Sequence, residues 1–224
     1  MAQSQIHPGM LRNVPLFAVL NETQVASLSA VMSRRAVVKN RVVMQAGDAT
    51  DSLYIIISGR VKVQMADDEG KEVILAALGP GEFFGEMGLM DDEPRAASVL
   101  TTEACEFVVI TKDDFNLLLK DSFDLAMVIM RGLVKRLREA DRKIESLALL
   151  DVYGRIARVL IENSEEINGQ KIVKSRLPRQ DIAKMIGASR EMVSRVMKGL
   201  EVGGYIEVRD DGSTLLRERL SSHL

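Results

Sequence analysis

The sequence predicts an α+β protein in three parts: an N-terminal β jelly roll, a long helix and a C-terminal winged helix-turn-helix. Three observations predict this order. Short β-rich runs separated by glycine turns fill residues 36–110, an apolar heptad repeat follows them, and two short helical segments joined by a glycine turn lie near the C-terminus. We place the three parts at residues 1–120, 121–149 and 150–224.

The composition excludes several classes of protein. Of the 224 residues, 46% are hydrophobic, which suits packed cores rather than a disordered chain. Cys105 is the single cysteine, so an intrachain disulfide is impossible and a reducing compartment fits. The first ten residues lack the pattern of a signal peptide, and apolar runs such as Leu53–Ile57 are far too short to span a membrane. We therefore expect a cytoplasmic protein with no membrane partner.

Residues that would mark an enzyme or a metal centre are missing from the sequence. One cysteine cannot hold an iron–sulfur cluster, and His7 and His223 stand isolated near the two ends. The sequence has no Ser/His/Asp arrangement, Walker loop or GxSxG elbow. We predict that the protein is not an enzyme and that it has no metal or other cofactor.

Residues 36–110 have the pattern of a small antiparallel barrel or jelly roll, after a helical pattern over residues 14–33. Apolar and polar residues alternate in short runs, for example around Val61 and Val63. The polar stretch Asp67–Lys71 predicts a hairpin turn between two such runs.

The next segment is predicted to be one long amphipathic helix. Its apolar residues follow heptad a and d positions, and basic residues fill the opposite face. A second subunit is the simplest partner for this stripe, because two-fold dimers are the commonest oligomers. Packing against the core of the same chain is the alternative. The stripe consists of Phe123, Ala126, Met130, Leu133, Leu137, Ala140, Ile144 and Leu147.

Positive charge gathers in the C-terminal part of the chain. Residues 1–150 hold 17 Lys and Arg against 21 Asp and Glu, whereas residues 151–224 hold 13 against 11. The excess within residues 171–200 predicts a surface for DNA phosphates, with a solvated basic face as the alternative. The basic residues there are Lys171, Lys174, Arg176, Arg179, Lys184, Arg190, Arg195 and Lys198.

Residues 179–197 have the layout of a helix-turn-helix. Gly187 stands where the turn needs a positive φ, and the Ser189 hydroxyl can accept a backbone N–H at the start of the second helix. The first turns of that helix are expected to meet base edges, since arginine pairs with guanine and glutamate accepts from cytosine. An exposed helix with solvated charges is the alternative. The predicted DNA contacts are Arg179, Gln180, Ser189, Arg190, Glu191, Ser194, Arg195 and Lys198.

Two strands are predicted after this pair of helices. Tyr205–Val208 and Thr214–Leu216 flank the polar turn Asp210–Gly212. The pattern predicts a two-stranded wing.

A second motif lies in residues 81–98. Gly85 would let a ligand approach the backbone, and a helical turn beginning near Glu86 would direct free N–H groups at an anion. Arg95 follows in the same motif, and a guanidinium binds phosphate through paired, charge-assisted hydrogen bonds. A structural salt bridge made by this arginine is the alternative.

The two motifs together resemble those of the family that contains the catabolite activator (cAMP receptor protein) and the fumarate–nitrate regulator. The residues that carry the resemblance are Phe84–Met90, Pro94–Ser98 and Arg179–Arg195. It implies that the jelly roll binds a cyclic nucleotide, with Glu86 on the ribose hydroxyl. The cyclic phosphate would then be bound by Arg95 and by the backbone of Gly85, Met87 and Gly88.

Two departures from the catabolite activator bear on the ligand. Ala96 stands where that protein has serine, which makes the motif closer to kinase regulatory subunits and cyclic-nucleotide-gated channels. Ala140 and Asp141 stand where adjacent Thr and Ser contact adenine across the dimer. We expect cAMP as the allosteric effector, but cGMP, cyclic di-GMP or no nucleotide stay open. With cyclic di-GMP, Asp141 could contact guanine together with Arg138 and Arg142.

The resemblance also implies the DNA target. Arg190, Glu191 and Arg195 match positions that recognise a TGTGA half-site, so a homodimer on a TGTGA-like palindrome in double-stranded DNA is expected. Pro178 stands where the family often has Thr or Ser, and proline is tolerated at a helix start. A hinge is expected near residues 149–152, and RNA polymerase is expected as a further partner. A cyclic-nucleotide-binding regulatory subunit that controls a partner protein is a more remote alternative.

Overall fold

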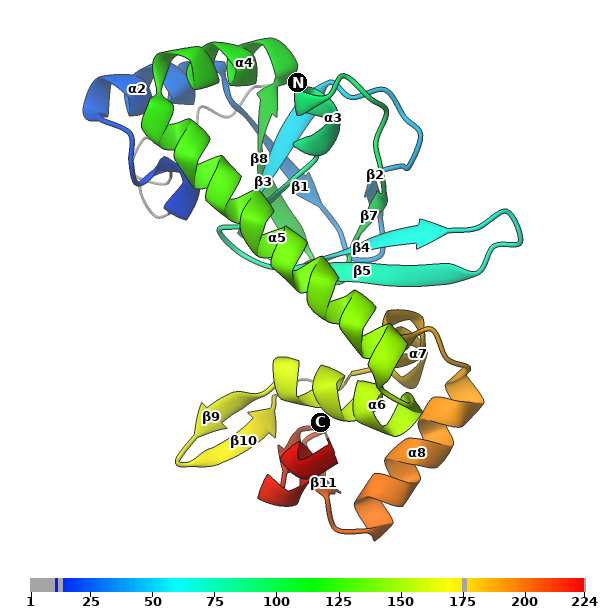
Figure 1. Cartoon of the computed structure of the whole chain (residues 1–224). Coiled ribbons are helices and arrows are strands. Elements are labelled where there is room, and N and C mark those ends of the chain that lie inside the picture. The colour runs from blue at the N-terminus through cyan, green and yellow to red at the C-terminus, as the bar shows by residue number, and fades with distance from the viewer. Residues whose placement is uncertain (1–10, 12–13, 175–176, 224) are drawn as a thin grey trace. The chain divides into compact units, whose positions relative to one another are not determined.

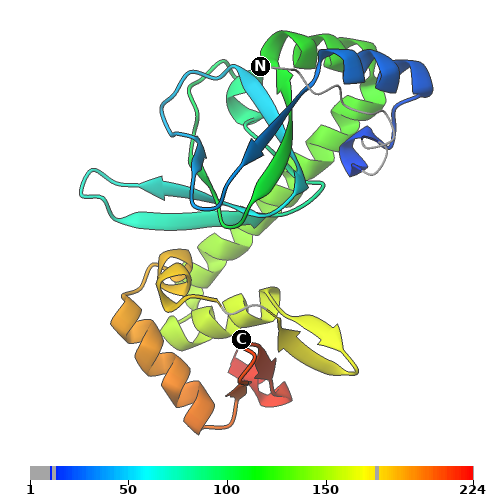
Figure 2. The same cartoon turned by 180° about the vertical axis from the view of Figure 1, so that it is seen from behind.

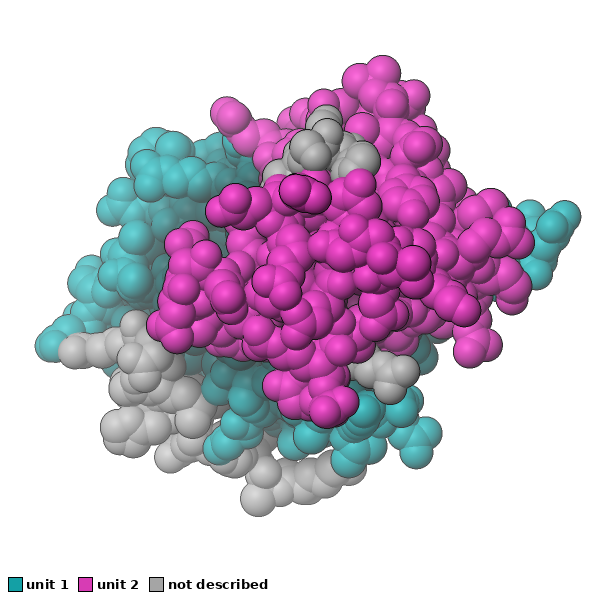
Figure 3. Space-filling model, turned by 90° about the horizontal axis from the view of Figure 1, so that it is seen from below, with its two compact units in different colours: residues 1–135 teal, residues 136–224 magenta. Residues whose placement is uncertain are grey.

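The computed structural model describes residue 11 and residues 14–174 and 177–223, and it forms two compact units, residues 1–135 and 136–224 (Figure 1, Figure 3). The first ten residues, on which the signal-peptide prediction rests and which include His7, lie outside the described residues, and so does Arg176 of the predicted basic surface. Among the described residues, no helix has both the length and the apolar composition that a membrane crossing requires.

Two antiparallel four-stranded sheets build the first unit and confirm the predicted jelly roll (Figure 1, Figure 2). One sheet has the order β1-β8-β3-β6 and the other has the order β2-β7-β4-β5. The strands are β1 (Ser33–Val37), β2 (Val42–Met44), β3 (Ser52–Ser58), β4 (Val61–Ala66), β5 (Glu72–Leu78), β6 (Phe83–Phe84), β7 (Ser98–Thr101) and β8 (Cys105–Thr111).

Local chemistry explains the turns and strand ends of this unit. The Asp67 carboxylate accepts hydrogen bonds from the backbone N–H groups of Glu69 and Lys71, which closes the predicted hairpin between β4 and β5.

Cys105 is buried, as its place in an alternating strand predicts, and this burial raises the pKa of its thiol.

The helical pattern before the strands is broken into two elements. A 3-10 helix, η1 (Pro15–Phe17), is followed by α2 (Glu22–Val31). The break lies at Asn21, whose side chain accepts from the Gln24 N–H while the Gln24 side chain accepts from the Asn21 N–H. This reciprocal capping box satisfies N–H groups that a helix start leaves free, so it begins a new helix.

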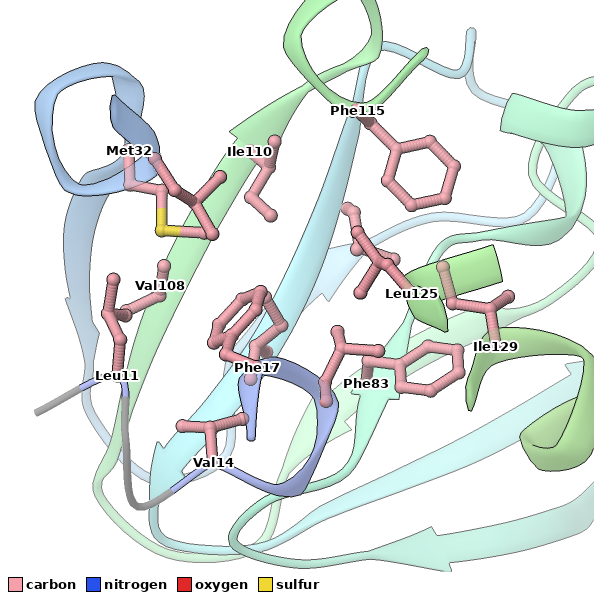
Figure 4. Close-up of a cluster of buried hydrophobic side chains, with 14 of the residues drawn as sticks. Leu11, Val14, Phe17, Met32, Phe83, Val108, Ile110, Phe115, Leu125 and Ile129 are labelled. Atoms are coloured by element: carbon pink, nitrogen blue, oxygen red, sulfur yellow. The ribbon is translucent and has the colours of Figure 1, made fainter. Parts of the chain in front are cut away.

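Two helices follow the jelly roll where the sequence predicted one. The helix α4 (Lys112–Asp121) is capped by the Thr111 hydroxyl, and the extended Ser122 separates it from α5 (Phe123–Leu149). Leu125 and Ile129 of α5 are 2% and 1% exposed and pack with Phe83 and Phe115 in the core of the first unit (Figure 4). The start of α5 is therefore part of the jelly-roll core.

The apolar stripe of α5 divides between two roles. Ala126 and Leu133 are partly buried, and Leu133 packs against the core of the first unit, which is the alternative of packing within the same chain. The heptad pattern did not predict that Leu125 and Ile129 face this core, because both residues lie outside its a and d positions. An exposed stripe remains, formed by Phe123, Met130, Val134, Leu137, Ala140, Ile144 and Leu147.

The second unit is a helix-turn-helix with a small sheet. Its elements are α6 (Val152–Glu162), β9 (Glu165–Ile167), β10 (Gln170–Val173), α7 (Arg179–Ile186), α8 (Arg190–Val202), β11 (Ile206–Val208), β12 (Thr214–Leu216) and the 3-10 helix η2 (Glu218–His223). The predicted two-stranded wing is present, but it belongs to a four-stranded sheet of order β11-β12-β10-β9. Asn168 and Gly169 both have positive φ and form the hairpin turn between β9 and β10.

Candidate functional site

A buried arginine organises the first candidate site. The Arg95 side chain is 4% exposed. Its Nη1 donates to the Gly85 carbonyl at 2.9 Å, and its Nη2 donates to the Ser52 carbonyl at 2.8 Å and to Asp51 Oδ1 at 3.0 Å. The Arg95 N–H also donates to the Asp48 carbonyl at 2.9 Å. The guanidinium is therefore held in one orientation by two segments of the chain, Asp51–Ser52 and Gly85.

Asp51 supplies the internal salt bridge that was the alternative role for this arginine. Its side chain is 81% exposed, however, and an ion pair whose carboxylate faces water contributes little free energy. Within the described part of the chain, the hydrogen bonds of Arg95 come from Nη1 and Nη2, which leaves Nε–H for another acceptor. The arrangement can accept an anion without releasing the two carbonyl contacts.

The glycines of the motif are needed by the protein itself. Gly85 has φ +86°, and a Cβ there would lie 2.5 Å from Arg95 Nη1. A Cβ on Gly88 would lie 2.2 Å from the Glu93 carbonyl oxygen. Both positions must remain glycine because neighbouring atoms occupy the space of a side chain. The guanidinium fills the space beside Gly85, and ligand approach to the Gly85 backbone stays a prediction.

The remaining predicted ligand residues divide into two groups. Glu86 is 2% exposed and adjoins Gly85, just before α3 (Met87–Met90). Met87 and Ala96 are exposed. Among the predicted ligand residues, Gly85 bonds directly to the Arg95 side chain. Ala140 and Asp141 lie on exposed positions of α5 in the second unit.

The helix-turn-helix forms the second candidate site, and its turn has the predicted chemistry. Gly187 has φ +67°, and the Ala183 carbonyl accepts from the N–H groups of Gly187 and Ala188. The Ser189 hydroxyl accepts from the Met192 N–H at 3.1 Å and caps α8.

The second helix of this motif has one buried and one exposed face. Val193, Met197 and Leu200 are at most 2% exposed and pack into the core of the unit. The opposite face is polar and exposed, so it is free to contact a partner. It carries Arg190, Glu191, Ser194, Arg195 and Lys198.

Glu191 is held in its charged form. Hydrogen bonds from its own backbone N–H and from the Ser189 hydroxyl, with the nearby Arg190 charge, lower the pKa of its carboxyl. An ionised carboxylate only accepts hydrogen bonds, which suits a base edge with an amino group.

The start of α7 completes this surface. Pro178 precedes the helix and makes no side-chain capping hydrogen bond. Its carbonyl accepts from the N–H groups of Asp181 and Ile182, so the helix begins here without a side-chain cap. Gln180 is exposed and Arg179 is partly exposed.

Comparisons with known proteins cover both sites. Residues 34–122 match the family model for a cyclic nucleotide-binding domain, and residues 154–221 match the model for a Crp-like helix-turn-helix domain. The cAMP-activated global transcriptional regulator Vfr of Pseudomonas aeruginosa is 34% identical over 196 residues, which cover 84% of this chain and 91% of Vfr. The cAMP-activated global transcriptional regulator CRP of Haemophilus influenzae is 39% identical over 162 residues, which cover 70% and 72% of the two chains.

The chain belongs to the CRP/FNR family of transcription regulators. A solved structure agrees: the c-di-GMP responsive global regulator CLP of Xanthomonas campestris is 32% identical, with a TM-score of 0.75, and the match covers 88% of this chain and 99% of CLP. As a CRP/FNR protein, the chain is a DNA-binding transcription regulator with a cyclic-nucleotide-binding domain, and it is not an enzyme.

Two residues that the sequence did not predict as site residues make long-range hydrogen bonds beside these sites. Asp51 orients Arg95 from 44 positions away, and Arg155 bonds to the ends of two helices. An Asp before a strand and an Arg within an amphipathic helix are both ordinary in sequence, so only their long-range partners reveal them.

Removing the cap of the reading helix should destabilise the second unit. We expect Ser189→Ala to lower its free energy of unfolding by about 1 kcal/mol, because a helix N–H loses its acceptor. Ser194→Ala, on the exposed face of the same helix, should change it by less than about 0.5 kcal/mol. Thermal melting of both variants without DNA measures the difference, and equal melting temperatures would contradict the capping role.

Proposed function

We propose that this protein is a homodimeric regulator in which a cyclic nucleotide at Arg95 changes the affinity of α8 for a TGTGA-like palindrome. The observation that carries the proposal is the buried Arg95 guanidinium, oriented by Gly85 and Ser52 and paired with a solvent-facing carboxylate. A buried arginine with donors still free is suited to a phosphate.

The residues around Arg95 suit a cyclic phosphate, but they do not distinguish one nucleotide base from another. Arg95 would bind the cyclic phosphate with the backbone of Gly85, Met87 and Gly88, and Glu86 would accept from the ribose hydroxyl. The names of Vfr and CRP favour cAMP as the effector. CLP is described as c-di-GMP responsive, and Ala140 and Asp141 lack the hydroxyls that would favour adenine, so cyclic di-GMP is the second candidate.

The dimer is inferred from the exposed stripe of α5. Leu137 and Ile144 are 62% and 64% exposed, and both lie on a helix face that also exposes Met130, Val134 and Leu147. Apolar side chains in this number on one helix favour burial against a second copy. Two copies would present two reading helices, as a palindromic site requires.

The DNA contacts follow from the exposed face of α8. We infer that Arg190, Glu191 and Arg195 contact base edges. Phosphates would be contacted by the remaining polar residues near the two helix starts, namely Arg179, Gln180, Ser189, Ser194 and Lys198. We infer RNA polymerase as the protein partner through which the bound regulator acts.

Removing the guanidinium tests the sensor. We expect Arg95→Ala to lower nucleotide affinity by roughly ten- to a hundredfold and to abolish nucleotide-dependent DNA binding, because charged hydrogen bonds to the phosphate are lost. Arg95→Lys keeps the charge without the paired donors and should be nearly as weak. The exposed Arg41→Ala is the matched control. A normal nucleotide response in both Arg95 variants would overturn the sensor assignment.

Calorimetry with cAMP, cGMP and cyclic di-GMP identifies the effector. We expect saturable binding of one of them, with cAMP first. Binding of cyclic di-GMP alone that is lost in Asp141→Ala would assign guanine contacts to α5. No binding of any of the three would leave a DNA-binding regulator whose first unit responds to something else.

Base reading is tested on α8. We expect Arg190→Ala to cost about 1–3 kcal/mol on a TGTGA palindrome and to relax specificity at one base pair. Lys198→Ala should weaken all DNA sequences alike and reduce the salt dependence, as expected of a phosphate contact. Fluorescence anisotropy on single-base variants of the half-site measures both, and an unchanged specificity profile for Arg190→Ala would contradict its role.

A further inference from the structure

One side chain joins the ends of two helices in the second unit. Arg155, in the first turn of α6, donates from Nε to the Leu150 carbonyl at 3.0 Å and from Nη2 to the Leu147 carbonyl at 3.1 Å. Its Nη1 donates to the Ile186 carbonyl at 3.2 Å. Leu147 and Leu150 lie at the C-terminal end of α5, and Ile186 is the last residue of α7.

The chemistry of these acceptors suits a guanidinium. The last carbonyl groups of a helix have no N–H partner within that helix, and they carry its partial negative charge. Only arginine offers a planar set of donors that can reach three such oxygens at once. The Asp151 carboxylate caps α6 by accepting from the Gly154 N–H at 2.9 Å, so the start of α6 is fixed as well.

The Leu147 side chain also lies beside this turn. The Leu147 Cδ2 lies 4.0 Å from the position that a Cβ on Gly187 would occupy. Leu147 belongs to the exposed stripe of α5, and Gly187 forms the turn that precedes α8. The last turn of α5 thus adjoins the turn that sets the start of the reading helix.

We propose that Arg155 is a positioning residue that transmits movement of α5 to α8 through the α7–α8 turn. The corner between α5 and α6 is then a clamp and not the free hinge expected near residues 149–152. Any shift of the end of α5 moves Ile186 and Gly187 with it, because one rigid guanidinium bonds both helix ends. The regulatory consequence rests on the proposed function, in which nucleotide binding acts through α5.

Arg158 provides a matched control one turn along the same helix. Its Nη1 donates to the Arg142 carbonyl at 3.0 Å and to Glu145 Oε2 at 3.3 Å. Among the described residues, these bonds join α6 to α5 and do not reach α7. A general loosening of the corner should therefore appear in both arginine variants, whereas loss of the link to the turn should appear only in Arg155→Gln.

The coupling experiment uses the full-length protein and a duplex with two TGTGA half-sites. DNA affinity is measured by fluorescence anisotropy without nucleotide and with saturating cAMP, or cyclic di-GMP where that is the effector. We expect Arg155→Gln to lower the ratio of the two affinities at least about fivefold. Arg158→Gln should keep the wild-type ratio, and both should bind nucleotide in the absence of DNA as wild type does. An unchanged ratio in Arg155→Gln, or an equal fall in Arg158→Gln, would overturn the proposal.

A second readout is independent of any nucleotide. Amide hydrogen exchange at residues 187–189 should become at least about fivefold faster in Arg155→Gln than in Arg158→Gln, since the turn loses its anchor. Equal exchange in the two variants would overturn the clamp. A wild-type protein without any nucleotide response would count against the proposed function, while the exchange rates would still decide the clamp.

A third variant keeps the test valid should Arg155→Gln fail to fold. Leu147→Ala shortens the side chain that lies beside the turn and keeps the main-chain carbonyls to which Arg155 donates. We expect it to increase exchange at residues 187–189, whereas Ile144→Ala, one turn earlier on the same stripe, should not. Equal exchange rates in Leu147→Ala and Ile144→Ala would show that the effect is general to the apolar stripe. That result would overturn the proposed route through the α7–α8 turn.

Discussion

The hydrogen bonds of Arg95 are the constraint on which the sensor site depends. One guanidinium joins the loop before β3, the glycine before α3 and its own segment, and Gly85 must lack a side chain for this to happen. The carbonyl partners fix the plane of the guanidinium, while the carboxylate partner faces solvent. In the proposed function, a phosphate would compete only with the solvent-facing carboxylate, the weakest of these contacts.

The helix α5 belongs to two environments, and this explains how one element can serve both a sensor and a DNA reader. Its first turns supply Leu125 and Ile129 to the jelly-roll core, and its last turn lies against the turn of the helix-turn-helix. Between them runs an apolar stripe that neither core covers. In the proposed function, a change in the packing of that stripe would act on both ends of this helix, whose backbone hydrogen bonds resist bending.

In each of the two units, an arginine orients backbone segments that are distant in sequence. Arg95 and Arg155 each bond to main-chain carbonyls of segments distant in sequence, and each uses the fixed geometry of the guanidinium to orient them. In the first unit the result is a fixed guanidinium, which we propose as the anion receptor. In the second it is a rigid junction beside the reading helix. Both sites of this CRP/FNR protein thus rest on backbone positions rather than on pairs of side chains.

By itself, the sequence determined the main secondary-structure elements and the resemblance to the family. The alternation of residues 36–110 predicted the jelly roll, and Gly187 with Ser189 predicted the turn and the cap before α8, because such signals depend on neighbouring residues. Only the tertiary structure decided that Leu125 and Ile129 enter the core, that Asp51 pairs with Arg95, and that Arg155 bonds to Ile186. Asp51 and Arg95 are 44 positions apart, and such partners are chosen by sheet closure and helix packing rather than by local periodicity.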